Sequence, residues 1–171
     1  MPGVDGVGVV VAAGPDVSIK PGTRVAYHQS LTRDGSFAEF CLLEASIVLI
    51  VPSALDDGIA ATLPCPGLTA WQALEKIPQV SDDVLVVGAG GAVCLLLVQL
   101  AVQRGYRVWA TAAQKHHARL KSLGVVGVVD YREDNWQQIL QAGQTKKDGL
   151  AAIFFNTQRL IPPKQRYFIS R

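Results

Sequence analysis

The sequence VLVVGAGGAVC at residues 84–94 determines the fold expected for this chain. Four apolar, mostly β-branched residues come first, a glycine-rich turn follows, and an apolar stretch continues to residue 102. This order predicts a buried strand at residues 84–87 that turns directly into a helix at residues 92–104. Residues 84–102 are also long enough to cross a bilayer. Three glycines interrupt them where the strand would end, so we favour the strand, turn and helix.

Strands and helices alternate after this turn. We expect further strands at residues 107–111, 125–129 and 150–155, and helices at residues 115–123 and 135–141. Glycines 105, 124 and 143 follow the three helices and supply the left-handed residue that such ends favour. Apolar strands in this alternation form a parallel sheet covered on both faces. The expected fold class is therefore α/β, with a partial doubly wound parallel sheet.

The first part of the chain has a different pattern. Short apolar runs bounded by Gly and Pro predict strands at residues 7–13, 23–27, 36–43 and 47–51. Helical spacing follows at residues 54–63 and 68–77, with prolines 64, 66 and 78 as boundaries. We therefore expect a small irregular β unit over residues 1–78, a second domain over residues 79–158 and a loose tail at residues 159–171.

The turn between the strand and the helix has the features of an anion site. The first N–H groups of a helix lack acceptors within it and carry its positive dipole end, which suits a pyrophosphate. Small residues are needed there because a side chain would keep the backbone away from the phosphates. The candidate cofactor-binding residues are Ala89, Gly90, Gly91, Ala92 and Val93.

The end of the second strand indicates which dinucleotide is preferred. Folds that bind NAD place a carboxylate about 20 residues beyond the turn. Here the strand ends at Thr111, no carboxylate follows, and Lys115 precedes His116 and His117. A cation attracts a 2′-phosphate, so NADP(H) is the expected cofactor and Thr111 and Lys115 are further candidates. For the two histidines we favour ordinary solvated positions at a helix start.

Composition excludes several classes of function. The formal net charge of +2 is too small to indicate a nucleic-acid partner. Three widely spaced cysteines form neither a disulfide framework nor a metal half-site. No basic and then apolar leader follows Met1. We expect a cytoplasmic protein with neither a nucleic-acid nor a membrane partner.

Five blocks in order resemble the medium-chain dehydrogenase/reductase family, especially its zinc-independent, quinone-oxidoreductase-like branch. They are PGVDGVG at 2–8, GSFAE at 35–39, GLTAW at 67–71, the turn at 88–94 and DYRE at 130–133. The resemblance implies a partial GroES-like β unit before a partial Rossmann sheet that binds NADP(H). It also implies that Thr69 lies near the nicotinamide and that Lys115 and Tyr131 contact the 2′-phosphate. Cys94 stands where the family's turn has its third glycine, and we expect it to be a packed core thiol.

The resemblance also bears on metal binding. Zinc-dependent relatives have Gly-His-Glu where this chain has Gly3, Val4 and Asp5. Valine cannot bind a metal, and Cys65, which matches a cysteine ligand of those enzymes, is alone. We therefore expect no zinc.

Without zinc, the family's chemistry is hydride transfer between the nicotinamide and a small carbonyl, quinone or enone. Tyr27 and His28 are both open as proton donors. Because the matched blocks begin inside the family's substrate domain and only four of six strands are expected, the resemblance implies truncation at both ends. The alternatives to an NADPH-dependent oxidoreductase are an NADP(H)-binding module without turnover, a zinc-type relative that has lost its metal, and a non-functional remnant. The expected partner is a small-molecule substrate, and a homodimer is allowed.

Overall fold

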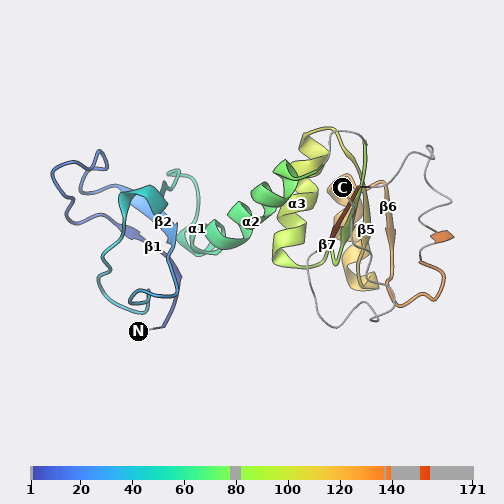
Figure 1. Ribbon diagram of the computed structural model, residues 1–171, viewed down its shortest axis with the longest axis horizontal. Coiled ribbons are helices and arrows are strands. Elements are labelled where there is room, and N and C mark those ends of the chain that lie inside the picture. Colours follow the sequence, from blue (N-terminus) through green and yellow to red (C-terminus); the bar gives the residue numbers. More distant parts are fainter. Residues whose placement is uncertain (1, 78–81, 137, 140–150, 155–171) are drawn as a thin grey trace. The chain divides into compact units, whose positions relative to one another are not determined.

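The computed structural model describes residues 2–77, 82–136, 138–139 and 151–154 of the 171-residue chain (Figure 1). The chain divides into two compact units, Met1–Thr69 and Ala70–Arg171. The domain boundary expected after residue 78 stays a prediction, because a division by compactness need not follow a family's domain boundary. The expected tail at residues 159–171 lies outside the described residues.

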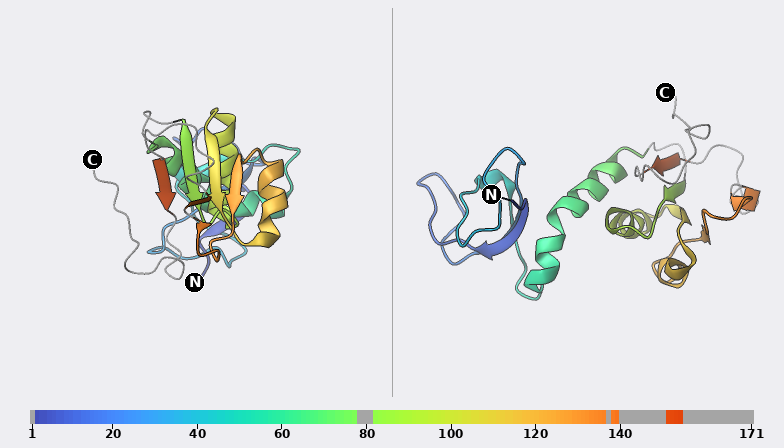
Figure 2. Two further views of the ribbon diagram at one scale, coloured as in Figure 1. Left: turned by 90° about the vertical axis from the view of Figure 1, so that its right-hand side faces the viewer. Right: turned by 90° about the horizontal axis from the view of Figure 1, so that it is seen from below.

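The second unit contains a parallel sheet of four strands in the order β6-β5-β4-β7 (Figure 2, left). Its strands are β4 (Asp83–Val87), β5 (Arg107–Thr111), β6 (Gly127–Val129) and β7 (Ala151–Phe154). Val87 lies beside Thr111, and Thr111 beside Val129, so three carboxyl ends meet at one edge. This confirms the doubly wound arrangement expected from the alternating pattern.

Two of these strands differ from expectation in their described length. β6 is shorter than residues 125–129 because the N–H of Val125 donates to the carbonyl of Leu120, which closes the preceding helix instead of joining the sheet. The β7 strand confirms residues 151–154 of the fourth expected strand, and its outer positions 150 and 155 lie outside the described residues.

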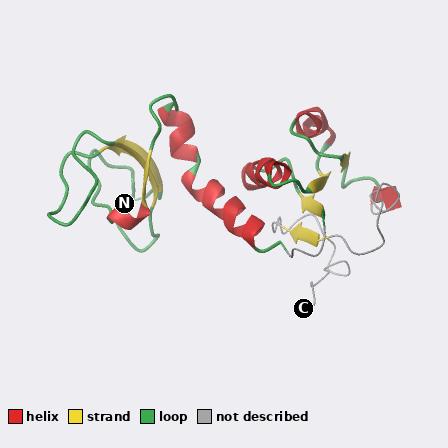
Figure 3. Cartoon of the chain, turned by 90° about the horizontal axis from the view of Figure 1, so that it is seen from above, coloured by secondary structure: helices red, strands yellow, loops and turns green. Residues whose placement is uncertain are grey.

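Helices α3 (Ala92–Gln103) and α4 (His117–Ser122) lie on the same side of this sheet (Figure 3). Leu97 from α3 and Leu120 from α4 are fully buried against Val86 and Val108 of the strands. The expected helix at 115–123 begins as a 3-10 turn, η2 (Gln114–His116), and becomes α-helical only from His117. The helix expected at 135–141 lies partly outside the described residues, with 136, 138 and 139 helical.

The other face of the sheet is also buried. Leu85, Val87, Trp109 and Val129 form a second cluster, and Trp136 packs against it. The indole N–H of Trp109 donates to the carboxylate of Asp83 at 3.0 Å. All five residues of β4 are buried, which explains why residues 84–87 are apolar without alternation.

Helix α2 (Pro64–Glu75) starts four residues earlier than expected. Prolines 64 and 66 do not bound this helix, because both lie in its first turn, where a helix has no use for the missing N–H. From Ala70 onward the helix belongs to the second unit, and Leu74 enters its core. There the guanidinium of Arg104 lies 4.8 Å from the centre of the Trp71 ring.

The first unit is an antiparallel sheet of three strands in the order β1-β2-β3. Its strands are β1 (Asp5–Val9), β2 (Arg24–His28) and β3 (Val48–Ile50), with a 3-10 turn, η1 (Ala45–Ile47), before β3. Helix α1 (Asp57–Thr62) follows, shorter than the expected 54–63 because Asp56 caps it by accepting the N–H of Ile59 at 3.2 Å. The β1 strand ends at Val9 instead of residue 13.

The strand expected at residues 36–43 does not form, so that prediction was wrong. The N–H groups of Ser36 and Phe37 donate to the carbonyls of Gly3 and Pro2. The N–H of Ala38 donates to the carbonyl of Ser36 at 2.8 Å. The large apolar side chains of this segment, including Phe37 and Leu42, are exposed. Residues 36–43 alternate as a strand would, but no neighbouring strand among the described residues pairs with them, so they form an extended loop.

No helix in the described part of the chain is long and apolar enough to cross a membrane. The apolar residues 84–102 form β4, the turn and most of α3, as expected from their glycines.

Candidate functional site

The glycine-rich turn lies between β4 and α3 at the carboxyl edge of the parallel sheet. Gly88 has φ +76°, a left-handed conformation that a residue with a side chain adopts only with strain. Its N–H donates to the hydroxyl of Thr111 at 3.2 Å, and the N–H of Ala89 donates to the Thr111 carbonyl at 2.9 Å. Thr111 is buried and holds the turn from the neighbouring strand.

Helix α3 begins directly on this turn, with Gly91 as its N-cap. The N–H groups of Ala92, Val93 and Cys94 come next, in the part of a helix where N–H groups have no acceptor within it. The first turn of α3 has no acidic side chain to neutralise the positive end of the dipole. The arrangement therefore offers backbone donors and a partial positive charge to an anion.

The side chains of Ala89, Val93 and Cys94 face the core, whereas that of Ala92 is exposed. Ala89 is completely buried, and Val93 packs on the cluster between α3 and the sheet. The Cys94 thiol is buried 3.7 Å from the carbonyl of Val87, and burial raises the pKa of that thiol to about 11. Cys94 is thus a protonated core residue, as expected. The turn can contact a ligand through its backbone.

The loops after β5 and β6 lie at the same edge of the sheet and carry the basic residues. Asp130 follows β6 and accepts the N–H of Gln114 at 3.1 Å and the N–H of Arg132 at 3.0 Å. These bonds join the loop after β5 to the loop after β6, and so they fix the backbone beside Lys115 and Tyr131. The Lys115 side chain is exposed, and the Tyr131 ring lies 5.4 Å beneath the guanidinium of Arg132.

The sequence interpretation did not include Asp130 among the site residues. The N–H donors of Arg132 and Gln114, with the Arg132 and His117 side chains nearby, lower the pKa of this carboxyl below its usual 3.8. An Asp just after a strand and before a turn often accepts a nearby backbone N–H. That local signal was available within the block DYRE.

The lowered pKa of Asp130 leads to a prediction about acid stability. A carboxyl whose folded-state pKa is depressed stabilises the fold above its unfolded-state pKa, and this contribution is lost as the pH falls through the folded-state pKa. We expect Asp130→Asn to lower the urea midpoint of unfolding at pH 7, followed by tryptophan fluorescence. The difference from the unmodified chain should shrink as the pH falls below about 3.8. Asp134→Asn, at an exposed position nearby, is the matched control; equal midpoints for all three proteins at pH 7 would contradict the prediction.

Thr69 does not lie at a helix start as expected. It is the sixth residue of α2, and its hydroxyl donates to the carbonyl of Cys65 at 2.7 Å. Its contact with a nicotinamide stays a prediction. Val4 offers no donor atom to a metal, and among the described residues no three His, Cys, Asp or Glu side chains lie close enough together to hold one.

The two candidate proton donors occupy neighbouring positions on β2. Tyr27 is buried, and its hydroxyl lies 3.1 Å from the sulfur of Cys41; burial, with Cys41 beside it, raises the pKa of Tyr27 to about 12. Nδ1 of His28 lies 2.9 Å from the carboxylate of Asp5 on β1. Tyr27 therefore keeps its proton near neutral pH, whereas His28 is oriented by an acidic neighbour.

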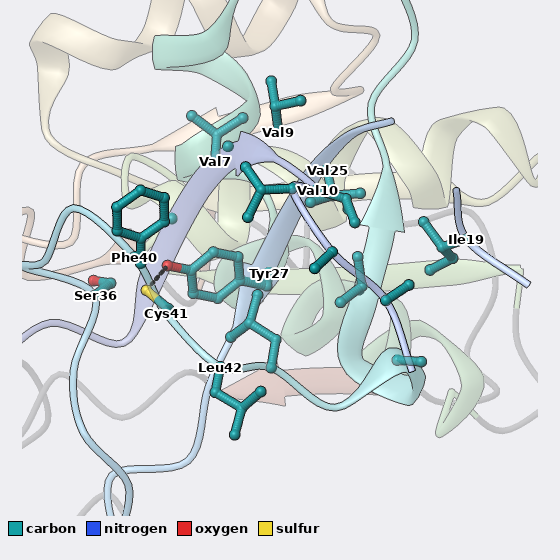
Figure 4. A pocket seen from close by; sticks show the side chains of 18 of the residues that line it. Val7, Val9, Val10, Ile19, Val25, Tyr27, Ser36, Phe40, Cys41 and Leu42 are labelled. Atoms are coloured by element: carbon teal, nitrogen blue, oxygen red, sulfur yellow. Dashed lines mark hydrogen bonds between the residues drawn. The ribbon is translucent and has the colours of Figure 1, made fainter. Parts of the chain in front are cut away.

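The first unit also contains a cavity of about 360 Å³ (Figure 4). Its lining is mostly apolar and includes Val7 and Leu42, with the Tyr27 hydroxyl and Cys41 sulfur on one wall. Ser36 also lines it, and its hydroxyl is buried without a hydrogen-bond partner among the described residues. The sequence did not predict this cavity, because residues 36–43 were expected to pair as a strand.

Comparisons with known proteins extend these observations. The chain is 33% identical to a trans-enoyl reductase of Aspergillus terreus over 86% of its own length and 55% of that protein. Among solved structures, the quinone oxidoreductase of Coxiella burnetii superimposes with a TM-score of 0.72 and 32% identity, covering 88% of this chain and 48% of that one. A mycobacterial protein solved in complex with NADPH gives a TM-score of 0.68 and 36% identity, covering 82% of this chain and 46% of the other.

No family model matches the sequence. The chain spans about half the length of the relatives just described. The two solved structures match more than four fifths of this chain at sequence identities above 30%. The proteins that this chain resembles, among them enoyl reductases, quinone oxidoreductases and alcohol dehydrogenase-like proteins, are members of the medium-chain dehydrogenase/reductase family.

Proposed function

We propose that this chain binds NADP(H) at the carboxyl edge of its parallel sheet and serves an oxidoreductase that transfers hydride to a small carbonyl, quinone or enone. The observation that supports it best is the Thr111-anchored turn, which presents the start of α3 beside Lys115. A similar solved structure contains NADPH, and similar proteins are named enoyl reductase and quinone oxidoreductase.

The turn suits the pyrophosphate shared by all nicotinamide dinucleotides. The backbone N–H groups of residues 90, 92 and 93 would donate to its oxygens, and the N–H of Gly91 donates to the carbonyl of Gly88 at 3.1 Å. The side chains of Ala89 and Val93 do not stand in the way because they pack into the core. Gly88 permits the left-handed step that brings the backbone into this path.

The loops after β5 and β6 suit a 2′-phosphate. Lys115 is exposed and would supply the cation, with Tyr131 at the same edge as a hydroxyl donor. The carboxylate of Asp130 is also nearby, but each of its oxygens already accepts a backbone N–H. We infer that Asp130 shapes the loops and does not take the 2′-hydroxyl role that a carboxylate has in NAD-specific sites.

The nicotinamide, when bound, supplies the hydride, and the protein's part is to orient it and to exclude water. We propose Thr69 as a residue near the nicotinamide, on the strength of the family resemblance. Of the two candidate proton donors we favour His28, because Asp5 fixes one ring nitrogen and no other partner of the ring occurs among the described residues. The high pKa of Tyr27 makes that hydroxyl a poor acid.

The cytoplasm is the proposed setting of the protein. Cys41, Cys65 and Cys94 are free thiols, which agrees with a reducing compartment such as the cytoplasm. The homodimer stays a prediction, which sedimentation of the purified chain would test.

The proposed function is tested in two steps. Titration of the 171-residue chain with NADPH, followed by nucleotide fluorescence, should show saturable binding that ADP-ribose 2′-phosphate displaces. NADPH oxidation is then followed at 340 nm with a quinone and with an enone. Binding with turnover supports the oxidoreductase, and binding without turnover supports the NADP(H)-binding module instead. Absence of NADPH binding by a folded chain would overturn the proposal.

A further inference from the structure

The imidazole of His116 lies against the glycine turn. A Cβ atom added to Gly90 would stand 2.5 Å from Cδ2 and 2.8 Å from Nε2 of His116, much closer than real atoms approach. The ring thus packs on the bare Cα of Gly90, at the centre of the proposed anion site. A side chain at position 90 and the imidazole at its present position exclude each other.

Three hydrogen bonds fix the backbone that carries this ring. The N–H of His116 donates to the carbonyl of Ala113 at 2.9 Å, which closes the 3-10 turn η2. One residue before Lys115, the N–H of Gln114 is held by Asp130. One residue after His116, the ring of His117 bonds to the carbonyl of Ala112 at 2.9 Å. His116 is therefore presented to the turn by a loop held on both sides.

The two adjacent histidines have different surroundings. His117 uses Nε2 within the loop, whereas neither ring nitrogen of His116 has a hydrogen-bond partner in the part of the chain that the structure describes. His116 is half-buried, so its ring is partly removed from water at the same time. The imidazole of His116 is thus half-buried, has a ring nitrogen that is free among the described residues and can donate a hydrogen bond, and lies beside the backbone N–H donors of the turn. This arrangement suits a ligand with acceptor oxygens.

We propose that His116 is a further cofactor-binding residue, which donates an imidazole N–H to the pyrophosphate of the dinucleotide held on the turn. This inference rests on the proposed function. It divides recognition between neighbouring residues: Lys115 contacts the 2′-phosphate that only NADP(H) carries, and His116 contacts the phosphates that NADP(H) and NAD(H) share. The structure places His116 half-buried on Gly90, whereas the sequence favours an ordinary solvated position for it.

The division of roles is tested by titrating the full chain and its variants with NADPH and with NADH, using nucleotide fluorescence. Loss of one hydrogen bond to a charged group predicts that His116→Ala weakens both nucleotides about tenfold. His116→Gln keeps an N–H donor and should recover part of the affinity. Lys115→Ala should weaken NADPH alone, and Lys121→Ala, an exposed change on α4, should leave both nucleotides unchanged.

The results of these titrations distinguish a failure of the His116 inference from a failure of the proposed function. Unchanged affinity of folded His116→Ala for both nucleotides would overturn the inference while the proposed function stands. Tighter binding would also overturn it, because the ring would then be covering the turn. If the unmodified chain binds no NADPH, the proposed function itself fails.

The contact between His116 and Gly90 is tested separately by thermal unfolding. Gly90→Ala should lower Tm because the new methyl group meets the imidazole. Gly90→Ala combined with His116→Ala should restore much of that loss. If the double variant melts at or below the temperature of Gly90→Ala, the ring does not lie on the turn and the inference loses its geometric basis.

Discussion

Leu97→Ala is expected to lower the free energy of unfolding by about 2–5 kcal/mol, the usual cost of removing a large aliphatic side chain from a packed core. Leu97 is fully buried at the interface of α3 with the sheet, among residues of the largest core cluster. The loss combines reduced apolar burial with the cavity that a stiff sheet cannot fill. Urea unfolding followed by circular dichroism measures it.

The matched control for Leu97 lies on the same helix. Gln103 is exposed at the end of α3, so Gln103→Ala should change the free energy of unfolding by less than about 0.5 kcal/mol. Equal effects of the two substitutions would mean that α3 does not pack on the sheet as described.

Lys115→Glu is expected to weaken NADPH binding by roughly 10- to 150-fold, since it removes a charge-assisted hydrogen bond of about 1.5–3 kcal/mol and adds a repulsive charge. NADH lacks the 2′-phosphate, so its affinity should change by less than about threefold, and the preference should shift toward NADH. Competitive titration with the two nucleotides measures the ratio. The Lys115 side chain is exposed, so the substitution should not disturb the fold.

A second lysine provides the control for net charge. Lys121→Glu changes the charge of the chain equally, at an exposed position further along α4. If both variants weaken NADPH to the same degree, the effect is one of overall charge. The assignment of Lys115 to the 2′-phosphate would then be wrong.

The sequence predicted the parallel sheet well because its strands are defined by local pattern. Residues 84–87 and 108–110 are apolar runs followed by glycine or small residues, and burial on both faces requires such runs. Glycines 105 and 124 follow their helices with φ +87° and +92°, as the helix-end rule predicts.

The secondary-structure predictions that were wrong fall where tertiary contacts override the local sequence pattern. The alternation at residues 36–43 resembles a strand, but its backbone bonds to residues 2 and 3 and forms an extended loop. A proline in the middle of a helix ends it, whereas a proline in the first turn is tolerated. Prolines 64 and 66 lie in the first turn of α2, but the sequence alone does not show where that helix begins.

The candidate site was predictable in its backbone and less so in its side chains. The turn and Lys115 follow from glycine spacing and from the missing carboxylate after β5. The contact of His116 with Gly90 does not follow from the sequence, because it depends on where the 3-10 turn η2 places the loop at the edge of the sheet. The anchoring roles of Thr111 and Asp130 likewise depend on pairing between strands that are distant in sequence.

Thr111 and Asp130 both act on the backbone of the binding edge. The path of the loops is therefore set separately from the side chains at positions 115 and 116, which project from it. A substitution at position 115 can change which dinucleotide is preferred, and one at position 116 can change how tightly either dinucleotide is held, while the loops keep their course. Cofactor preference can accordingly diverge among related proteins by one or two replacements, without an intermediate that fails to fold.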